Sequence, residues 1–414
     1  MQGEDFSVEA ARLRREDRRR ARRHARRRAV KALALSTLAV CLLGLGWLTP
    51  LPATPGAGEA DQADWIGLTL RKGPPAAPGP LQIHLENLAL AFPGRAGIAV
   101  RDVSADWTAG VDLESPYPQQ SVSKLWVALS VLDAVDRGEI RLDDTVLVRR
   151  EDLSIFHQPL REKVGRGTYR THVRALLENS TTLSDNAAND VLMRLVGGPD
   201  RVRAVMGEKA LDGIGFGDEE RFFQTAIAGL DWRPDFSFGQ SFWRARESMP
   251  QGRRMAALEA YLADPPDGAT PGAVTAALDR LASGELLGAD ATEQLLALMA
   301  ASRTGPKRLG GGLTEGWSLA HKTGTGQVMG ARATGYNDVG LLTAPDGRVY
   351  AVAVMIAETT AAVPERQALM QAVTRAVIDH HAGRDPGAAP PDDFQFIPGD
   401  QQTAALDLRP ATRP

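Results

Sequence analysis

The stretch QSVSKLWVALSVLD at residues 120–133 contains Ser121, three residues before Lys124, and continues with apolar residues at three- and four-residue steps. This periodicity predicts a helix from Ser123 to Asp136. If the helix begins at Ser121, the side chains of Ser121 and Lys124 lie on the same face. A neighbouring base can activate a serine hydroxyl, and the helix N-terminus offers free N–H groups to a developing oxyanion. The pair therefore predicts a nucleophilic serine. An ordinary helix start with a surface lysine would give the same pattern and is the alternative when the string is taken alone.

A second string, SDN at residues 184–186, precedes another predicted helix and lies 63 residues beyond Ser121. Serine and aspartate are common N-cap residues, so a helix cap is the simplest interpretation of the string alone. In the catalytic interpretation, the Ser184 hydroxyl relays a proton to a leaving nitrogen. Asn186 then holds either Lys124 or the amide of a substrate.

The third string, KTG at residues 322–324, lies between predicted strand residues. Lys322 and the hydroxyls of Thr323 and Thr325 would bind a carboxylate, and Gly324 would let a substrate approach the backbone closely. The backbone N–H groups of Ser121 and Thr325 would form an oxyanion hole. The alternative is a sheet lysine beside a turn.

The lysine content strengthens the catalytic interpretation. The chain has 41 arginines but only seven lysines. Two of these lysines, Lys124 and Lys322, occupy positions where a compact or titratable ammonium is needed and a guanidinium would not serve.

In their order and separations, the three strings resemble the active-site motifs of the class A β-lactamases and, more broadly, of the penicillin-binding proteins. The resemblance covers roughly residues 85–382 and includes GELL at 284–287 and GW at 316–317. It implies a serine β-lactamase, which opens the β-lactam ring through an acyl-enzyme on Ser121 and then hydrolyses it, giving antibiotic resistance. It implies neither a cofactor nor a metal, and the scattered histidines suggest no metal site.

The resemblance also implies a glutamate that activates the water releasing the acyl-enzyme. Glu220 occupies this place, 36 residues after Ser184, in an E-x-x-x-N pattern in which Gln224 replaces the usual asparagine. The segment 225–270 is longer than is usual in the family. Glu259 lies in this expansion and is a rival for the role, while Glu220 could instead be an exposed charge in an acidic turn.

The distribution of predicted elements indicates an α/β (α+β) fold. Strands are expected at 81–85 and 97–100, a hairpin at 339–342 and 349–356, and a final amphipathic helix at 365–381. The intervening sequence is mainly helical, at 174–177, 187–196, 273–282 and 291–301. This order predicts a β-lactamase-like antiparallel sheet built from both ends of the chain and flanked by helices, with an inserted all-helical subdomain.

The N-terminal region carries a strong charge asymmetry. Residues 1–31 hold 12 basic and five acidic side chains, and residues 32–48 form an uncharged, mostly apolar run that contains the only cysteine, Cys41. Seventeen residues reach the lower limit for a membrane-spanning helix, and the basic flank places that end in the cytoplasm. A cleavable signal peptide is the alternative.

These features predict the domain organisation. It consists of a basic cytoplasmic segment (1–31), a transmembrane anchor or signal core (32–48), a Pro/Gly/Ala-rich linker (49–80), a catalytic domain (81–382) and a Pro-rich tail (383–414). The expected location is the inner membrane with the catalytic domain in the periplasm, or the periplasm itself if the signal is cleaved. The expected partners are a small β-lactam substrate and the membrane, not nucleic acid, and the catalytic domain is expected to be a monomer.

Two other functions remain open from the sequence. One is a D,D-peptidase-like penicillin-binding protein that is acylated by penicillin and deacylates slowly. The other is a non-catalytic sensor that binds penicillin or peptidoglycan. Arg332 and Arg366 are further candidates for contacting a substrate carboxylate.

Overall fold

The computed structural model describes residues 75–387. The predicted basic segment, the apolar run and the greater part of both the linker and the tail lie outside the described residues. None of the helices between residues 75 and 387 is long and apolar enough to cross a membrane.

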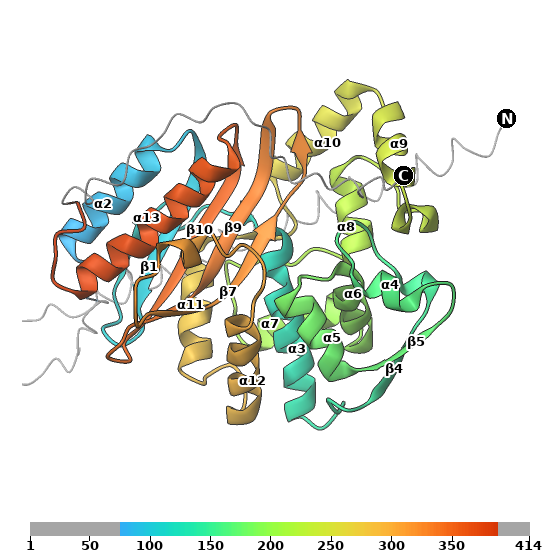
Figure 1. Ribbon diagram of the computed structural model, residues 1–414, viewed down its shortest axis with the longest axis horizontal. Helices are drawn as coiled ribbons and strands as arrows, with labels where there is room; N and C mark the ends of the chain where they lie inside the picture. Colours follow the sequence, from blue (N-terminus) through green and yellow to red (C-terminus); the bar gives the residue numbers. More distant parts are fainter. Residues whose placement is uncertain (1–74, 388–414) are drawn as a thin grey trace, which may run out of the picture. The chain divides into compact units, whose positions relative to one another are not determined.

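The main sheet is antiparallel, with the strand order β2-β1-β10-β9-β7 and a short strand β8 paired with β9 (Figure 1). Its strands come from both ends of the described chain, as the sequence predicts. They are β1 (Gly94–Asp102), β2 (Thr108–Val111), β7 (Ser318–Thr325), β8 (Val328–Met329), β9 (Arg332–Thr343) and β10 (Val349–Thr359). Two small pairs lie outside this sheet: β3 (Tyr117–Pro118) with β6 (Gly268–Ala269), and β4 (Thr145–Val148) with β5 (Tyr169–His172). The predicted hairpin is the β9–β10 pair.

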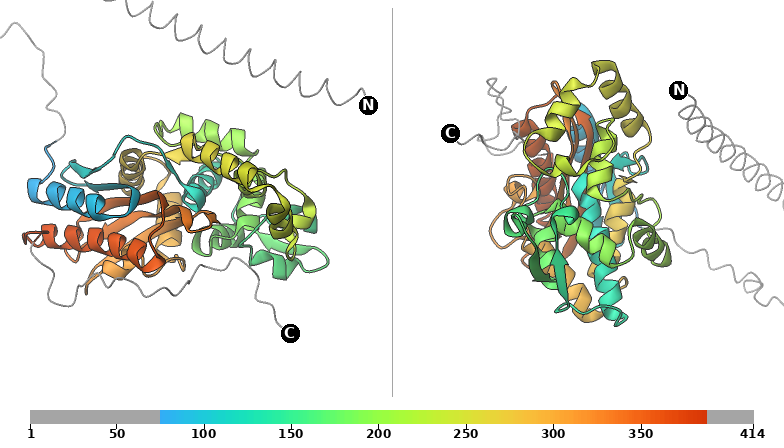
Figure 2. Two further views of the ribbon diagram at one scale, coloured as in Figure 1. Left: turned by 90° about the horizontal axis from the view of Figure 1, so that it is seen from above. Right: turned by 90° about the vertical axis from the view of Figure 1, so that its right-hand side faces the viewer.

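Helices cover both faces of the sheet, because successive side chains of a strand point to opposite sides. Along β10, Val352 and Val354 enter the apolar core shared with α2 (Gly79–Ala91) and α13 (Val363–His381). The intervening Ala353 and Met355 enter the core on the other face, shared with α11 (Pro271–Ala282) and α3 (Lys124–Asp136). Figure 2 shows α2 and α13 side by side on their face.

The predicted strand at 81–85 is wrong, because these residues form part of α2. Their alternation of apolar and polar residues fits a strand, but Leu81 and Leu85 are also four residues apart on one face of a helix. Both leucines are fully buried, whereas Ile83 is 59% exposed. Packing against α13 therefore favours the helical period over the strand period.

The helical half is built around α3. Residues 124–134 of this helix are all buried, so it is covered on every side and lies at the centre of the subdomain. Around it lie α5 (Val173–Thr182), α6 (Asn186–Leu195), α7 (Pro199–Glu208) and α12 (Ala289–Ala300) (Figure 1). The predicted central helices are confirmed. The short α4 (Leu160–Val164) and the 3₁₀ turns η2 (Arg150–Asp152) and η4 (Leu309–Gly312) complete the connections.

The expanded segment after Gln224 is folded. It completes α8 (Glu220–Ile227) and adds a 3₁₀ turn η3 (Pro234–Ser237), α9 (Ser241–Ser248) and α10 (Gln251–Ala263) before β6. Its aromatic residues Phe242 and Trp243 pack against Phe156, whose backbone has a left-handed φ of 61°. The expansion therefore supports the loop that carries His157.

Candidate active site

Ser121 lies in a 3₁₀ turn, η1 (Gln120–Ser123), that runs directly into α3. The turn begins at Gln120, whose φ of 53° is unusual for a residue with a side chain. Such a conformation costs on the order of 1–3 kcal/mol and persists only when its surroundings hold it. The Gln120 N–H donates to Asp267 Oδ2 at 2.7 Å, which fixes this bend immediately before Ser121.

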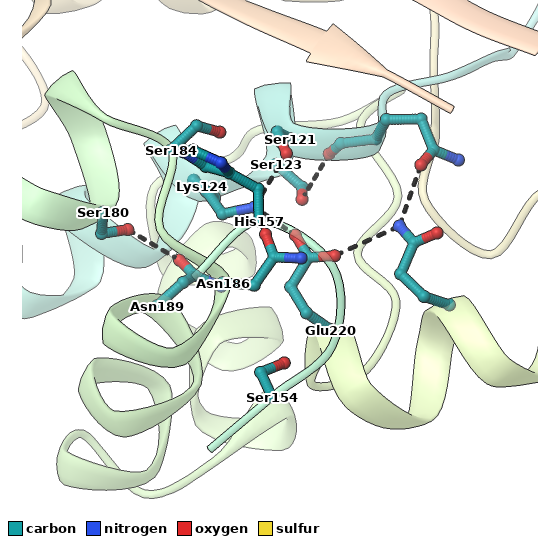
Figure 3. A network of polar contacts seen from close by, with 12 residues as sticks. Ser121, Ser123, Lys124, Ser154, His157, Ser180, Ser184, Asn186, Asn189 and Glu220 are labelled. Carbon is teal, nitrogen blue, oxygen red and sulfur yellow. Dashed lines mark hydrogen bonds and ion pairs between the residues drawn. The ribbon is translucent and has the colours of Figure 1, made fainter. Parts of the chain in front are cut away.

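Lys124 is fully buried at the start of α3, and its ammonium has three partners (Figure 3). It donates to Ser121 Oγ at 2.8 Å and to Asn186 Oδ1 at 2.9 Å, and it forms an ion pair with Glu220. Glu220 is only 4% exposed, so the interpretation of this residue as an exposed charge in an acidic turn is wrong. The structure thus brings together four of the residues that the sequence singles out.

The residues of the SDN string have two roles: one caps a helix, and the other two contact the lysines of the site. Asp185 is the N-cap of α6 and accepts from Ala188 N at 3.0 Å, as the simpler interpretation predicts. Ser184 has a left-handed φ of 60°, and its hydroxyl accepts from Lys322 Nζ at 3.0 Å. Asn186 holds Lys124 through its oxygen and donates through Nδ2 to Ile155 O at 2.8 Å. Asn186 is therefore a lysine-holding residue in this structure.

Strand β7 forms the opposite wall and carries Lys322, Thr323, Gly324 and Thr325. Lys322 is fully buried, and burial, with a smaller effect of Lys124, lowers its pKa well below the ordinary lysine value. A Cβ at Gly324 would lie 2.2 Å from Gln119 O, so the glycine permits β7 to pass close to the η1 turn. The close approach that we expected from a substrate is thus already made by the protein backbone.

Sequence reasoning missed Arg308, which lies against the same strand. This arginine is 4% exposed and donates to Gly324 O at 2.9 Å and to Thr325 Oγ1 at 2.5 Å. The arginines proposed from the sequence are engaged elsewhere: Arg332 pairs with Glu259 and Glu358, and Arg366 donates to Ala361 O. Arg308 carries no motif of its own, so only the fold identifies it.

The rival glutamate is not at the site. The Glu259 side chain is 53% exposed on α10, and it forms its ion pair with Arg332. Arg332 in turn holds a β10 glutamate, so this pair joins the expansion to the sheet. Geometry therefore favours Glu220 for the role beside Lys124.

Asp190 is a second residue that sequence reasoning missed. It lies on α6, four residues after Asn186 and therefore on the same helix face. Its Oδ1 accepts from Glu220 N at 2.7 Å and its Oδ2 accepts from Ser154 Oγ at 2.6 Å. Burial, reinforced by the nearby Glu220, raises the pKa of Asp190 to about 7. The i, i+4 spacing in the sequence NAAND was the available signal.

These groups define a class of protein. The Ser121 hydroxyl contacts the buried Lys124–Glu220 pair. A second serine, Ser184, lies just before α6 and contacts Lys322 on strand β7, which forms the opposite wall of the site. This is the arrangement of a serine enzyme that forms and then hydrolyses an acyl intermediate, with nucleophile, proton acceptors and a cationic wall on separate elements.

Comparison with known proteins gives the family. A model described as the Beta-lactamase enzyme family matches residues 80–381, and the chain belongs to this family. β-Lactamase VEB-1 of Pseudomonas aeruginosa is 25% identical over 281 residues, 67% of this chain and 83% of VEB-1. The extended-spectrum β-lactamase PER-1 of the same organism is 25% identical over 297 residues, 71% of this chain and 85% of PER-1.

Solved structures of β-lactamases have the same fold as this chain. A β-lactamase from Chitinophaga pinensis superposes with a TM-score of 0.61 at 25% identity, covering 73% of this chain and 99% of that chain. The predicted fold and the predicted hydrolase activity on β-lactams are confirmed. A slowly deacylating penicillin-binding protein and a non-catalytic sensor are not favoured.

Proposed function

We propose that Ser121 attacks the lactam carbonyl carbon when the proton shared by the Lys124–Glu220 pair lies on Glu220, so that Lys124 is a neutral amine and accepts the hydroxyl proton. The bond from Ser121 Oγ to that carbon forms and the carbon–nitrogen bond of the ring breaks. Ser184 gives its hydroxyl proton to the leaving nitrogen and takes one from Lys124, which Glu220 then restores to the ammonium form. The observation that carries the proposal is the 2.8 Å contact between Lys124 Nζ and Ser121 Oγ, in an ammonium that is also paired with Glu220.

Deacylation is assigned to Glu220. A water molecule attacks the ester carbon, Glu220 takes one of its protons, and the bond between that carbon and Ser121 Oγ breaks. Lys124 gives Ser121 Oγ the proton that restores the hydroxyl and recovers a proton from Glu220. The buried position of Glu220 beside Lys124 supports this assignment, since general bases must lie within hydrogen-bond reach of the reacting groups.

Substrate binding is assigned to the β7 wall. The Lys322 ammonium and the hydroxyls of Thr323 and Thr325 would receive the carboxylate of the β-lactam, with Arg308 adding positive charge behind the strand. Charge-assisted bonds of this kind are stronger than neutral ones.

A chromogenic cephalosporin with intact-mass measurement tests this proposal. The wild type should turn the substrate over, and Ser121→Ala should lose both turnover and covalent labelling by a fluorescent penicillin. Ser123→Ala is the matched control and should keep labelling, because its hydroxyl donates to Gln120 O and does not contact Lys124. Labelling that survives Ser121→Ala would overturn the mechanism.

We also propose that residues 1–31 lie in the cytoplasm, that residues 32–48 anchor the protein in the inner membrane, and that the catalytic domain lies in the periplasm. The basic segment followed by an uncharged apolar run supports this arrangement. Fractionation should find the full chain in the inner membrane, and deletion of residues 1–60 should give a soluble protein. A soluble periplasmic form that begins after residue 49 would favour the cleaved signal instead.

A further inference from the structure

The expanded segment contributes two buried polar residues to the surroundings of Ser121. Tyr261, on α10, and Asp267, just before β6, are 6% and 1% exposed. The Tyr261 hydroxyl donates to Asp267 Oδ1 at 3.0 Å, and Asp267 Oδ2 receives the backbone N–H of Gln120 at 2.7 Å. Tyr261 and Asp267 therefore hold the left-handed residue that precedes the nucleophile.

Side-chain hydrogen bonds continue from this pair to Glu220. Gln120 Nε2 donates to the Tyr261 oxygen at 2.5 Å, and Gln224 Nε2 donates to Gln120 Oε1 at 2.9 Å. The second hydrogen of Gln224 Nε2 reaches Glu220 Oε2 at 3.2 Å. All five side chains are buried, so water does not replace a bond that is lost.

The bonds have a fixed direction. Asp267 accepts the Tyr261 hydrogen, so the phenol oxygen is left to accept from the Gln120 amide nitrogen. Gln120 then presents its amide oxygen to Gln224, and Gln224 presents its amide nitrogen to Glu220. Burial raises the pKa of Tyr261 well above its ordinary value, so the phenol keeps its hydrogen.

A reversed Gln120 amide would bring two NH₂ groups together at Gln224. Gln224 would then have to turn its oxygen toward the Glu220 carboxylate, where two acceptors repel each other. The orientation of the Gln224 amide beside Glu220 thus depends on the Tyr261 hydroxyl, two hydrogen bonds away, together with Gln327, whose Nε2 donates to Gln224 Oε1 at 3.2 Å.

We propose that Tyr261 and Asp267 are positioning residues for deacylation, acting through Gln120 and Gln224 on the orientation of Glu220. The proposal rests on the assignment of Glu220 as the deacylation base. It gives the expanded segment a role in the reaction, because α10 supplies the hydroxyl that sets the direction of the bonds.

Tyr261→Phe tests the proposal, since it removes only the hydroxyl. The deacylation rate constant should fall on the order of tenfold, as expected when a buried group loses its hydrogen-bond partner, and the acyl-enzyme should accumulate by intact mass. The acylation rate constant should change less than about threefold, because the contact of Lys124 with Ser121 is retained. Tyr117→Phe is the matched control: its buried hydroxyl also donates to an aspartate, Asp112, at 2.6 Å, but outside this network, and deacylation should be unchanged.

A double-mutant cycle separates positioning from loss of structure. Tyr261 and Gln224 form no hydrogen bond with each other and share only Gln120 as a partner. A structural effect of Tyr261→Phe that does not pass through Gln120 should therefore add to that of Gln224→Met. The proposal predicts instead that Tyr261→Phe has little further effect on deacylation in the Gln224→Met background. If Tyr261→Phe does not fold, Gln120→Met interrupts the same bonds with a side chain of similar length and should give the same deacylation defect.

Equal losses in acylation and deacylation, or additive effects in the cycle, would overturn the positioning role. Failure of the proposed function is a different result. In that case Glu220→Gln traps no acyl-enzyme, whatever Tyr261→Phe does.

Discussion

The two walls of the site each contain a fully buried lysine, but the two ammonium groups are in opposite electrostatic situations. Lys124, on α3, has a carboxylate partner in Glu220 and donates to two further side-chain oxygens. Lys322, on β7, forms no ion pair with any residue between 75 and 387 and donates to Ser184 Oγ and to its neighbour's carbonyl. The lysine of one wall is paired with a carboxylate of the protein, and the lysine of the other wall has none among residues 75–387.

This difference matches the division of labour in the proposed reaction. Proton transfer needs groups that exchange a proton without leaving an uncompensated charge, and a lysine–glutamate pair provides this. Binding an anion needs a charge that the protein itself has not satisfied, at some cost to stability. Burial lowers the pKa of Lys322 well below its ordinary value, and the carboxylate of a bound substrate would favour the charged ammonium again.

The largest expected effect comes from breaking the pair on the α3 wall. Glu220→Gln keeps the size of the side chain and removes the general base, so deacylation should slow by about 10²–10⁴-fold. The acyl-enzyme on Ser121 should accumulate and be detected by intact mass, while acylation slows less because Lys124 still accepts the first proton.

The control is Glu259→Gln, since that carboxylate pairs with Arg332 away from Ser121 and should not affect turnover. Trapping by Glu259→Gln with normal turnover in Glu220→Gln would show that the wrong glutamate has been assigned.

The next effect is on stability and should separate the two lysines. Lys124→Met leaves Glu220 buried without its partner, which typically costs about 3–5 kcal/mol of unfolding free energy. Lys322→Met replaces a buried amine that has no carboxylate partner by an apolar side chain of similar length, and it should leave stability unchanged or higher. Urea unfolding of both variants measures these changes. Equal destabilisation would show that the two lysines do not differ in their contribution to stability.

A smaller effect concerns binding on the β7 wall. Lys322→Met should raise KM for a carboxylate-bearing β-lactam on the order of 10–100-fold, which corresponds to loss of a hydrogen bond to a charged group. Lys307→Met, at an exposed lysine, is the matched control. Steady-state kinetics that show an unchanged KM in Lys322→Met would remove the substrate carboxylate from this wall.

The smallest effect is a pH dependence at Asp190. Its folded pKa of about 7 lies above the unfolded value of 3.8, so the folded state binds more protons between these values. This group therefore lowers stability as pH rises from about 4 to about 7. Asp190→Asn, which keeps an acceptor for Glu220 N, should be more stable than the wild type at pH 8 by on the order of 1 kcal/mol, and this gain should shrink towards pH 5. Thermal unfolding across this range would show a constant difference if Asp190 did not titrate.

Local sequence signals were sufficient to identify the reacting groups that lie nearest to one another along the chain. Ser121 and Lys124 are three residues apart at a helix start, and the geometry of a helical turn brings their side chains together wherever the helix lies. The periodicity of α3 and the β9–β10 hairpin are likewise local signals. The order and spacing of the strings placed Ser184, Glu220 and Lys322 at the same site through a family resemblance.

Other features of the fold and the site depend on packing between distant parts of the chain. The segment 81–85 has two possible periods, and contact with α13 selected the helix. Arg308 reaches the β7 strand, and Tyr261 reaches Gln120 across 141 residues, without any motif that marks them. Such contacts join distant parts of the chain, so they depend on how elements pack and not on the spacing of residues within one element. For the same reason, the role of the expanded segment could be seen only after it had folded against the η1 turn.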